Sequence, residues 1–401
     1  MKIVAIHHDG EALALFQKIG VDPYGIGAMT PKTRHVNILL SARPCKVANI
    51  LKQEMLSLGA DAAVSRGSVS CAVEATDVLL MGTHKQIGAL AGKIENQPFG
   101  LDVLARDLRV LLGRLEKKPL LLKTVKREIV LGERTLIMGV LNVTPDSFSD
   151  GRRYLNFSSA VNRGLQMAEE GADIIDIGGE STRPGAKTVA LKEEIARVVP
   201  LVEELSAKLT IPLSVDTMKA GVADKALKAG AEIVNDVSAL SGDRKMASVV
   251  RKASAALVLM HMRGIPADMQ EGDLRYADLT GEIFMFLEKA VQKALAAGIS
   301  RERLVVDPGI GFGKTHADNC RILNKLCEFR ALGLPLLVGT SRKAFIGSVT
   351  GDAVDRRMEG TAATVAAAVM NGCHIIRVHD VAAMKKVAAM TDAIVRAGMD
   401  S

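Results

Sequence analysis

GVLNVTPDSFSD, residues 139–150, contains the end of an apolar run, Leu136–Leu141, and the polar segment that follows it. The apolar run predicts a buried strand, and Pro145 and Gly151 are typical of a bend in the loop that follows. Short oxygen-bearing side chains at the end of a buried strand suit a hard cation or a charged substrate group. An ordinary strand-to-helix turn would also place Ser, Asp and Asn side chains as caps, so this stretch alone leaves both interpretations open.

The same arrangement of a strand and a following helix recurs to the end of the chain. Residues 125–131 and 135–141 flank Gly132-Glu133 and predict a hairpin that leads into the first strand. Further strands are predicted at 172–177, 213–216, 233–237, 256–260, 304–307, 334–338 and 375–378, with helical stretches between them. Eight such units over ~270 residues favour a (β/α)₈ TIM barrel. A doubly wound open sheet is the competing fold, but it usually has fewer strands and a glycine-rich turn after the first.

Polar residues stand at the carboxyl end of every predicted strand. In chain order these are Asn142 and Asp146; Gly178-Gly179-Glu180-Ser181-Thr182-Arg183; Asp216-Thr217; Asn235-Asp236; His261 and Arg263; Asp307; Ser341-Arg342-Lys343; and Arg377 with His379-Asp380. In a barrel these ends converge on one face, where barrel enzymes place their active sites. We therefore expect a ligand to account for all eight polar ends.

Three of these residues are hydrogen-bond acceptors or amides that would point into the barrel. Asp216, Asn235 and Asp307 suit the several N–H donors of a flat aminated heterocycle, because carboxylates form charge-assisted bonds with such groups. Lys343 is placed to meet a carbonyl oxygen or ring nitrogen of the same heterocycle. Any one of these residues could instead serve as a cap or a brace.

A second group is cationic. Arg377 and His379 are two residues apart on the last strand and therefore point to the same side. With Ser181, Thr182 and Arg183 from the second loop they predict a donor-rich pocket for an anion, in the region where barrels often hold phosphate.

The segment 307–315, DPGIGFGKT, resembles a phosphate-binding loop at first sight. A Walker A loop needs glycine where this chain has Pro308, so that template fails. We expect Gly309, Gly311 and Gly313 to let the backbone approach a flat ligand, with Phe312 as a wall for an aromatic ring.

Composition limits the possible partners and the compartment. The chain has 401 residues, 48% of them hydrophobic, and its 52 basic and 45 acidic residues give a net charge of +7. With no tryptophan and 3% aromatic residues, it lacks the stacking platforms of nucleic-acid-binding proteins, so a small anionic ligand is the better match. No apolar run approaches the ~18 residues of a membrane span, and the N-terminus lacks a secretory core. We expect a cytoplasmic protein that contacts neither nucleic acid nor membrane.

The five cysteines, Cys45, Cys71, Cys320, Cys327 and Cys373, are scattered and include no C-x-x-C pair. We expect reduced thiols and no zinc or redox module, although His316, Cys320 and Cys327 share a helical face by spacing.

Residues 1–120 predict a separate, smaller α/β domain of unknown role. Strands are expected at 2–6, 35–40 and 76–81 and helices at 46–58 and 101–115, and the TIM barrel would then occupy 121–401. No catalytic residue types concentrate in this N-terminal part.

Together, the motifs of the barrel region resemble the dihydropteroate synthase family. They read GVLNVTPDSFSDG (139–151), DIGGESTRPG (176–185), SVDT (214–217), NDVS (235–238), MHMRG (260–264), DPGIGFGK (307–314), GTSRK (339–343) and RVHD (377–380). They follow the order of the family through residues 125–401, while the first 120 residues lie outside the resemblance.

The resemblance implies a cytoplasmic transferase of folate biosynthesis, a sulfonamide target expected to form a homodimer. Its substrates would be 6-hydroxymethyl-7,8-dihydropterin diphosphate and para-aminobenzoate, and its products 7,8-dihydropteroate and diphosphate. Residue by residue it implies that Asp216, Asn235, Asp307 and Lys343 hold the pterin; that Asn142 binds Mg²⁺ on the diphosphate, with Asp146 in the catalytic loop; that Thr182, Arg377 and His379 bind that anion; and that Phe312, Pro184 and Lys343 frame the aminobenzoate.

Two positions depart from the family pattern. Arg152 stands where a second glycine is common in the first loop, and Ala344 replaces a serine near the aminobenzoate carboxylate.

Two other functions remain open: a pterin-dependent methyltransferase that serves a corrinoid partner, and a non-catalytic pterin-binding protein. The methyltransferase would have no evident use for Arg377, His379 and Lys343, and the retained anion pocket argues against a protein without catalysis.

Overall fold

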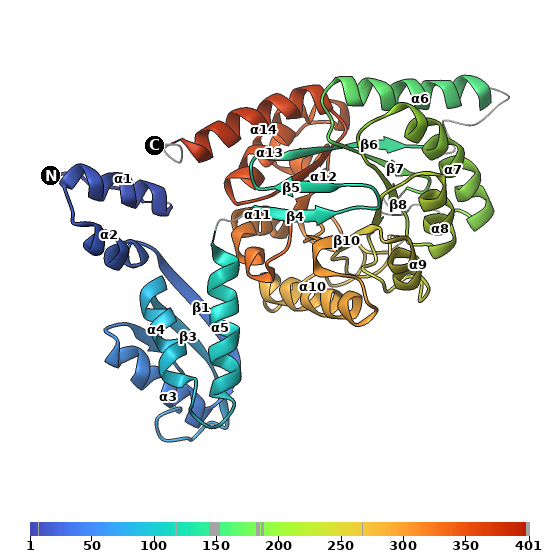
Figure 1. Ribbon diagram of the computed structural model, residues 1–401. Coiled ribbons are helices and arrows are strands. Elements are labelled where there is room, and N and C mark those ends of the chain that lie inside the picture. The colour runs from blue at the N-terminus through green and yellow to red at the C-terminus, as the bar shows by residue number, and fades with distance from the viewer. Residues whose placement is uncertain are drawn as a thin grey trace. The chain divides into compact units, whose positions relative to one another are not determined.

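The computed structural model describes residues 1–6, 8–116, 119–143, 153–181, 185, 188–266 and 268–397 (Figure 1). Contacts between Cα atoms divide the chain into two compact units, one of which comprises Met1–Glu116 and the other Lys117–Val395. In the described part of the chain, no helix is both long and apolar enough to cross a membrane.

The first unit is a small α/β domain built on a three-stranded antiparallel sheet in the order β1-β3-β2. Its elements are α1 (Asp9–Ile19), α2 (Pro23–Met29), β1 (His35–Pro44), α3 (Cys45–Ser57), β2 (Asp61–Ala63), β3 (Ala75–Thr83), α4 (His84–Ile94) and α5 (Leu101–Leu115). Its hydrophobic core joins Leu51, Leu80 and Ile87 from α3, β3 and α4. The strand expected at residues 2–6 is wrong: these residues pair with no neighbouring strand and carry no regular structure.

The expectation of five reduced cysteines is also wrong for this unit. Cys45, at the start of α3, and Cys71, in the loop before β3, form a disulfide. The fold brings together two thiols that lie 26 residues apart, and nothing in their spacing announces the pair. Cys320, Cys327 and Cys373 are free, as expected.

The second unit is a TIM barrel, as predicted. Its parallel strands are β6 (Leu136–Asn142), β7 (Ile174–Gly178), β8 (Leu213–Asp216), β9 (Ile233–Asp236), β10 (Ala256–Met260), β11 (Leu304–Asp307), β12 (Leu337–Val338) and β13 (Ile375–Val378). Neighbours along the sheet follow the order β11-β10-β9-β8-β7-β6-β13-β12, and a parallel bridge between Val306 and Leu336 closes the ring.

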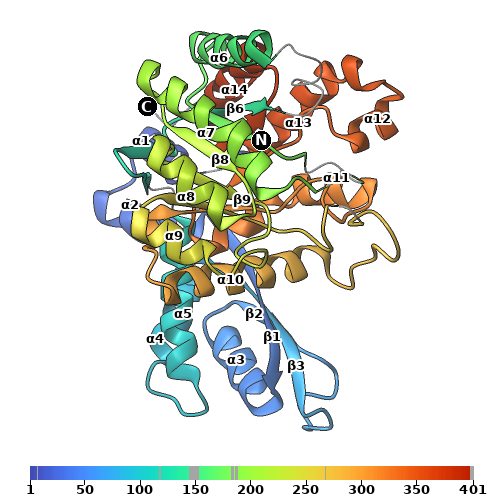
Figure 2. The same cartoon turned by 90° about the vertical axis from the view of Figure 1, so that its right-hand side faces the viewer.

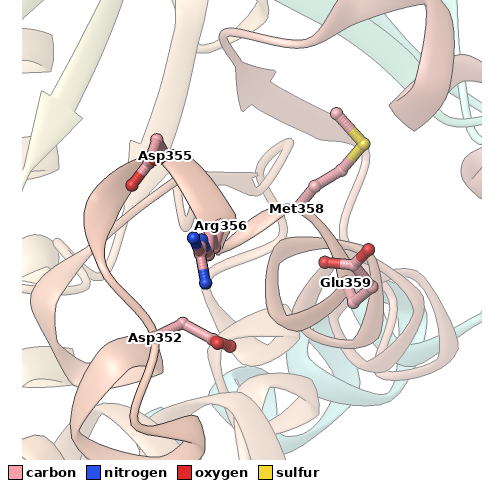
Figure 3. Close-up of a pocket in the computed structure, with 5 residues that line it drawn as sticks. All are labelled: Asp352, Asp355, Arg356, Met358 and Glu359. Carbon is pink, nitrogen blue, oxygen red and sulfur yellow. The ribbon is translucent and has the colours of Figure 1, made fainter.

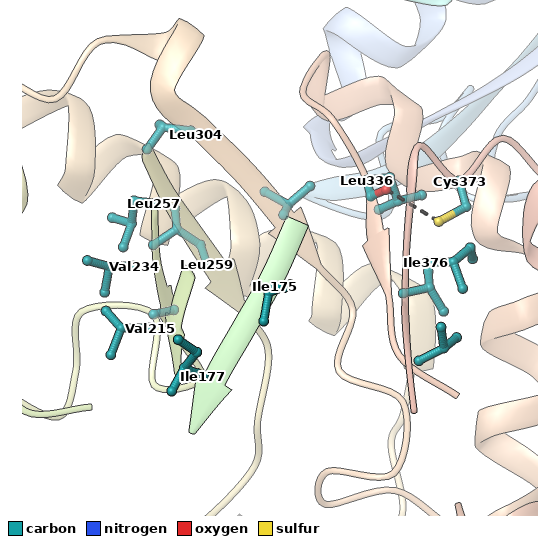
Figure 4. Packing of buried hydrophobic residues seen from close by; sticks show 14 of the residues in the cluster. Ile175, Ile177, Val215, Val234, Leu257, Leu259, Leu304, Leu336, Cys373 and Ile376 are labelled. Carbon is teal, nitrogen blue, oxygen red and sulfur yellow. Dashed lines mark hydrogen bonds between the residues drawn. The ribbon is translucent and has the colours of Figure 1, made fainter. Parts of the chain in front are cut away.

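Helices form the outer layer of the barrel, as Figures 1 and 2 show. They are α6 (Arg153–Glu169), α7 (Leu191–Lys208), α8 (Ala220–Ala229), α9 (Met246–Ala253), α10 (Leu279–Ala296), α11 (His316–Asn324), α12 (Ala344–Thr350), α13 (Met358–Met370) and α14 (Val381–Arg396). Alternate strand residues such as Ile175, Val215 and Leu257 face these helices and form the large hydrophobic core (Figure 4). This alternation directs the intervening residues into the barrel.

The hairpin before the barrel differs from the prediction. The strand β5 (Glu128–Leu131) pairs with β4 (Leu120–Lys123) and not with β6, because the turn at residues 124–127 closes on a hydrogen bond from the Thr124 N–H to the Arg127 carbonyl. Leu122 and Leu131 of this hairpin are fully buried against the amino ends of the barrel strands.

The interior of the barrel therefore has two levels. Toward the amino ends of the strands it is apolar, with Met138, Ile174, Ile233 and Ile375 in one cluster with the hairpin. Toward the carboxyl ends of the same strands, the residues that face the interior are polar: Asp176, Ser214, Asp216, Asn235, Asp307 and Arg377. The apolar level closes one end of the barrel, so a ligand has access to the polar groups only from the other end.

Candidate active site

Four residues form a row across neighbouring strands at the carboxyl edge of the sheet. The strand register pairs Asn142 with Gly178, Gly178 with Asp216, and Asp216 with Asn235. A Cβ atom on Gly178 would lie 3.3 Å from the Asn142 Oδ1 atom and 3.7 Å from the Asp216 Cβ atom. The glycine therefore leaves the space between Asn142 and Asp216 open.

Arg377 binds two carboxylates inside the barrel. Its Nε atom lies 2.6 Å from the Asp176 Oδ2 atom, and its Nη2 atom lies 2.7 Å from the Asp216 Oδ2 atom. The Asn235 side-chain amide donates to the same Asp176 oxygen at 2.9 Å. These residues and Ser214, which faces the same interior, are called the carboxylate cluster.

Three buried oxygen atoms of the carboxylate cluster have no hydrogen-bond partner among the described residues. They are the Asp176 Oδ1, Ser214 Oγ and Asp216 Oδ1 atoms. Leaving a buried acceptor unsatisfied costs roughly 1–3 kcal/mol, so three together are unusual in a folded protein. A ligand with several N–H donors would satisfy them.

The charges in this cluster compete. Burial raises the pKa of Asp216 to about 7, and the nearby Asp176, Glu194 and Asp236 carboxylates add to the rise, while Arg377 opposes it. Burial lowers the pKa of Arg377, but Asp176 and Asp216 outweigh that effect and raise it above its ordinary value. Arg377 is thus a permanent cation beside a carboxyl group that titrates near neutral pH.

The loop after β11 is held differently. The Asp307 Oδ1 atom accepts from the Gly309 N–H at 2.7 Å, and burial raises the pKa of this carboxyl group. Gly309, Gly311 and Gly313 all have positive φ, which favours glycine. A Cβ atom on Gly309 would overlap the His261 carbonyl oxygen at 1.9 Å. These glycines thus let the loop pack closely against the protein itself, and the expected approach of their backbone to a flat ligand stays a prediction.

Residues 309–313 are called the glycine loop, and a side chain donates to each of its five carbonyl groups. The donors are Lys314 to Gly309 at 2.9 Å and to Phe312 at 3.0 Å, Lys343 to Ile310, Gln270 to Gly311 at 2.9 Å, and Tyr276 to Gly313 at 2.8 Å. All five carbonyl groups of this loop therefore have a hydrogen-bond donor from the protein itself.

Lys343 and Phe312 meet beside the glycine loop. The Lys343 Nζ atom lies 4.5 Å from the centre of the Phe312 ring, a cation–π contact. Burial lowers the pKa of Lys343 to about 8, an effect that Asp307 opposes and Arg377 strengthens. The structure therefore brings Asp307, Phe312 and Lys343 to one side of the barrel mouth, as the sequence predicted.

The other predicted residues of the anion pocket are only partly described. The His379 Nδ1 atom lies 3.0 Å from the Ser341 Oγ atom, and Ser181 follows β7 at the mouth of the barrel. Asp146, Thr182, Arg183 and Pro184 lie outside the described residues, as does Arg152. Ala344 begins α12 and is exposed.

Not every polar strand end requires a ligand, contrary to the expectation. Arg342 and Asp380 form an ion pair with each other, at 2.6 Å and 3.0 Å. Asp236 accepts from the backbone N–H groups of Ser238 and Leu240. Arg263 lies 3.6 Å above the Tyr276 ring and pairs with Glu282. Through these contacts, the four side chains support the loops that carry them.

Sequence reasoning missed two residues of the site. Asp176 is fully buried and joins Arg377 to Asn235, and its signal was a carboxylate inside the apolar run IIDIG. Lys314, 1% exposed, lies beneath the glycine loop. It was included in a quoted motif, but its spacing did not show that it points inward.

A separate hollow of ≈ 580 Å³ lies away from these residues, on the segment that joins α12 to α13 (Figure 3). Asp352, Asp355, Arg356, Met358 and Glu359 line it, and none of them belongs to the predicted site.

Comparison with known proteins identifies the family. Residues 138–379 match the model of the pterin binding enzyme family. Dihydropteroate synthase of Bacillus subtilis is 47% identical over 266 residues, which are 66% of this chain and 90% of that protein. The chain belongs to the dihydropteroate synthase family. This confirms the resemblance, and the protein is an enzyme of the transferase class.

A solved structure of the dihydropteroate synthase family agrees with the fold. The enzyme of Burkholderia cenocepacia, complexed with 7,8-dihydropteroate, is 40% identical with a TM-score of 0.64, and the match covers 71% of this chain and 99% of that one.

The N-terminal unit has a counterpart in one relative. A probable bifunctional folylpolyglutamate synthase/dihydropteroate synthase of Halobacterium salinarum is 41% identical over 375 residues. The match covers 92% of this chain and 44% of that protein. It is longer than the barrel unit, Lys117–Val395, so it must extend into the N-terminal unit. The N-terminal unit is therefore shared by at least one relative of the dihydropteroate synthase family.

Proposed function

We propose that the chain joins 6-hydroxymethyl-7,8-dihydropterin diphosphate to para-aminobenzoate, which gives 7,8-dihydropteroate and diphosphate. The observation that supports this most strongly is the group of three unpartnered buried oxygens in the carboxylate cluster. A flat aminated heterocycle carries several N–H donors on one edge, and these donors would form hydrogen bonds to such oxygens. The Burkholderia cenocepacia relative, complexed with 7,8-dihydropteroate, supports the same substrate class.

The pterin would lie against the carboxylate cluster. The free oxygens of Asp176 and Asp216 would accept from its amino and ring N–H groups, and charge-assisted bonds of this kind are about twice as strong as neutral ones. Asn235 already donates to Asp176, so it would orient that carboxylate and offer its own side-chain carbonyl oxygen to the pterin as a hydrogen-bond acceptor. Asp307 and Lys343 would bind the opposite edge.

The diphosphate would lie toward the mouth of the barrel. Two nitrogens of Arg377 are held by Asp176 and Asp216, so its Nη1 atom remains for an anion unless one pair opens. We assign His379, Ser181 and Thr182 to the same anion.

Mg²⁺ is the metal that the family implies, and Asn142 suits it. Mg²⁺ commonly takes one or two protein oxygens and completes its shell with water and substrate phosphates. Among the described residues there is no cluster of three His, Cys, Asp or Glu side chains that could hold a metal ion without such help. Asn142 Oδ1, beside the open space above Gly178, would be the protein ligand. When bound, the ion would offset the charge that develops on the departing diphosphate.

The reaction would proceed by departure of the diphosphate before attack. The bond between the pterin methylene carbon and the diphosphate oxygen breaks, and the pterin ring shares the positive charge that is left. The amino nitrogen of para-aminobenzoate then forms the new C–N bond and loses a proton. Positioning of the two substrates and stabilisation of the departing anion would account for most of the rate acceleration, so no strong general base is required.

The aminobenzoate would lie between Phe312, Pro184 and the stem of Lys343. With Ala344 in place of serine, only the backbone N–H at this position would be available to its carboxylate.

The test is to mix purified protein with Mg²⁺, the pterin diphosphate and para-aminobenzoate, and to quantify dihydropteroate and diphosphate. We expect the two products in equal amounts, with loss of product when a sulfonamide competes with para-aminobenzoate. Binding of the pterin without any product would refute the proposed reaction in favour of a binding protein.

A further inference from the structure

Lys314 is a buried lysine that faces the protein and not the open part of the site. Its Nζ atom lies 2.9 Å from the His261 Nδ1 atom, 2.9 Å from the Gly309 carbonyl oxygen and 3.0 Å from that of Phe312. Ordering and burying a lysine is costly unless its donors are used. Here the side chain reaches back beneath the loop that precedes it and holds two of its carbonyl groups.

The contacts of Lys314 remain complete in either charge state. Burial lowers the pKa of Lys314 well below its ordinary value, and burial also lowers the pKa of His261 to about 2, so the imidazole is neutral. An ammonium donates to both carbonyls and to His261 Nδ1. A neutral amine donates to both carbonyls and accepts from His261 Nδ1–H in the other tautomer. The positioning of the loop thus does not depend on one charge state.

The glycine loop depends on such support. Three of its five residues have positive φ, and the Phe312 N–H donates to the Gly309 carbonyl at 3.2 Å. Each of the five carbonyls also takes a side-chain donor. Of these donors, Gln270 is exposed, and water can replace it. Lys314 is buried, and nothing could replace it.

Two of the three groups assigned to the aminobenzoate, Phe312 and Lys343, depend on the shape of this loop. Phe312 belongs to it, and its carbonyl is held by Lys314. Lys343 donates to the carbonyl of Ile310, and its Cδ atom lies 3.0 Å from the position of a Cβ atom on Gly311. A change in the shape of the loop would displace the Phe312 ring and the Lys343 side chain together.

We propose that Lys314 is a positioning residue, which holds the glycine loop in the shape that presents the Phe312 ring and the stem of Lys343 to the aminobenzoate. This rests on the proposed function, because it assigns that side of the site to para-aminobenzoate. Lys314 itself touches no substrate. Its influence should therefore fall mainly on the aminobenzoate, since Asp176, Asp216 and Asn235, which would hold the other edge of the pterin, lie on strands away from this loop.

The experiment compares Lys314→Met with Gln270→Met in the full-length protein. Both changes replace a donor to the same loop with an unbranched side chain, one beneath the loop and one on its exposed side. For Lys314→Met we expect the KM for para-aminobenzoate to rise roughly 10- to 100-fold, because small misplacements cost this much. The Kd of the pterin diphosphate, measured by calorimetry, should change less than about 3-fold, and Gln270→Met should change each constant by less than about 2-fold.

Lys314→Gln keeps two N–H donors, so it should raise the KM for para-aminobenzoate by a smaller factor and again leave the Kd of the pterin diphosphate nearly unchanged. This variant also provides the test if Lys314→Met does not fold. Equal loss of affinity for both substrates would overturn the proposal, because it would indicate general damage to the barrel. Unchanged constants in both Lys314 variants would also overturn it while leaving the proposed function intact. A wild-type protein that forms no dihydropteroate would refute the proposed function and the inference with it.

Discussion

The carboxylate cluster and the glycine loop lie at the same end of the barrel, yet their polar groups are satisfied differently. In the cluster, Asp176, Ser214 and Asp216 each keep a buried oxygen without a partner among the described residues. In the loop, every carbonyl from residue 309 to residue 313 accepts a side-chain donor. The two regions therefore differ in hydrogen-bond balance: the cluster has acceptors without donors, and the carbonyl groups of the loop all have donors.

This difference separates recognition from support. A site that is incomplete without a ligand gains its missing bonds when the ligand binds, whereas a complete site gains nothing and can only hold its neighbours in place. We therefore assign recognition of the pterin to the carboxylate cluster. We assign the positioning of Phe312 and Lys343 to the glycine loop.

The largest effect is expected where the cluster's single cation is removed. Arg377→Met would leave the buried Asp176 and Asp216 carboxylates unpaired, which should lower the free energy of unfolding by about 3–5 kcal/mol. Arg134→Met is the control, because Arg134 also binds a carboxylate, Asp173, but is half exposed. It should cost less than about 1 kcal/mol. Equal losses in urea denaturation would show that the two carboxylates do not depend on Arg377.

A smaller effect is expected from Asp216→Asn. This change keeps the shape of the side chain and removes a charged acceptor, which is worth about 1.5–3 kcal/mol, or roughly 10- to 200-fold in the Kd of the pterin diphosphate. Asp380→Asn, at another strand end but paired with Arg342, should leave that Kd within about 3-fold of the wild-type value. Calorimetry that gave both variants the same Kd would contradict the assignment.

The pH dependence of the reaction tests both regions together. Asp216 accepts N–H donors best when ionised, above its pKa of about 7, and Lys343 is a cation only below its pKa of about 8. The value of kcat/KM should peak between these limits and fall by up to tenfold per pH unit on either side. In Asp216→Asn the acid limb should disappear. A wild-type profile that stays flat from pH 5.5 to pH 7 would show that ionised Asp216 is not required.

The smallest effect is expected at Gly178. A Cβ atom in Gly178→Ala would crowd the Asn142 Oδ1 atom at 3.3 Å, so that side chain must shift by a few tenths of an ångström. We expect a roughly 2- to 5-fold higher Mg²⁺ concentration for half-maximal activity, with little change in stability. Gly92→Ala in α4, which has open space around it, is the matched control. An unchanged Mg²⁺ requirement in Gly178→Ala would argue against Asn142 as the metal ligand.

The sequence was a good guide to the barrel because its signals are local. Strands such as Ala256–Met260 and Leu304–Asp307 are short, mainly apolar runs between helical patterns, and the structure has them at the predicted residues. Polar residues at strand ends were also visible, and the structure places Asp216, Asn235 and Asp307 inside the barrel as expected.

What the sequence could not supply is which polar group pairs with which. Arg377 and Asp176 are 201 residues apart, and Arg342 and Asp380 are 38 apart, so only the closed barrel shows that one pair belongs to the site and the other supports a loop. The same holds for the disulfide between Cys45 and Cys71. The partner of β5 depended on a turn at Thr124 that has no strong sequence signal.

The most direct test is a crystal structure of this protein with 7,8-dihydropteroate. We predict that the Asp176 Oδ1 and Asp216 Oδ1 atoms accept hydrogen bonds from the heterocycle, and that the aminobenzoate ring packs on Phe312 while the glycine loop keeps its five donors. A heterocycle bound elsewhere, with both oxygens still unpartnered, would contradict the division between recognition and support.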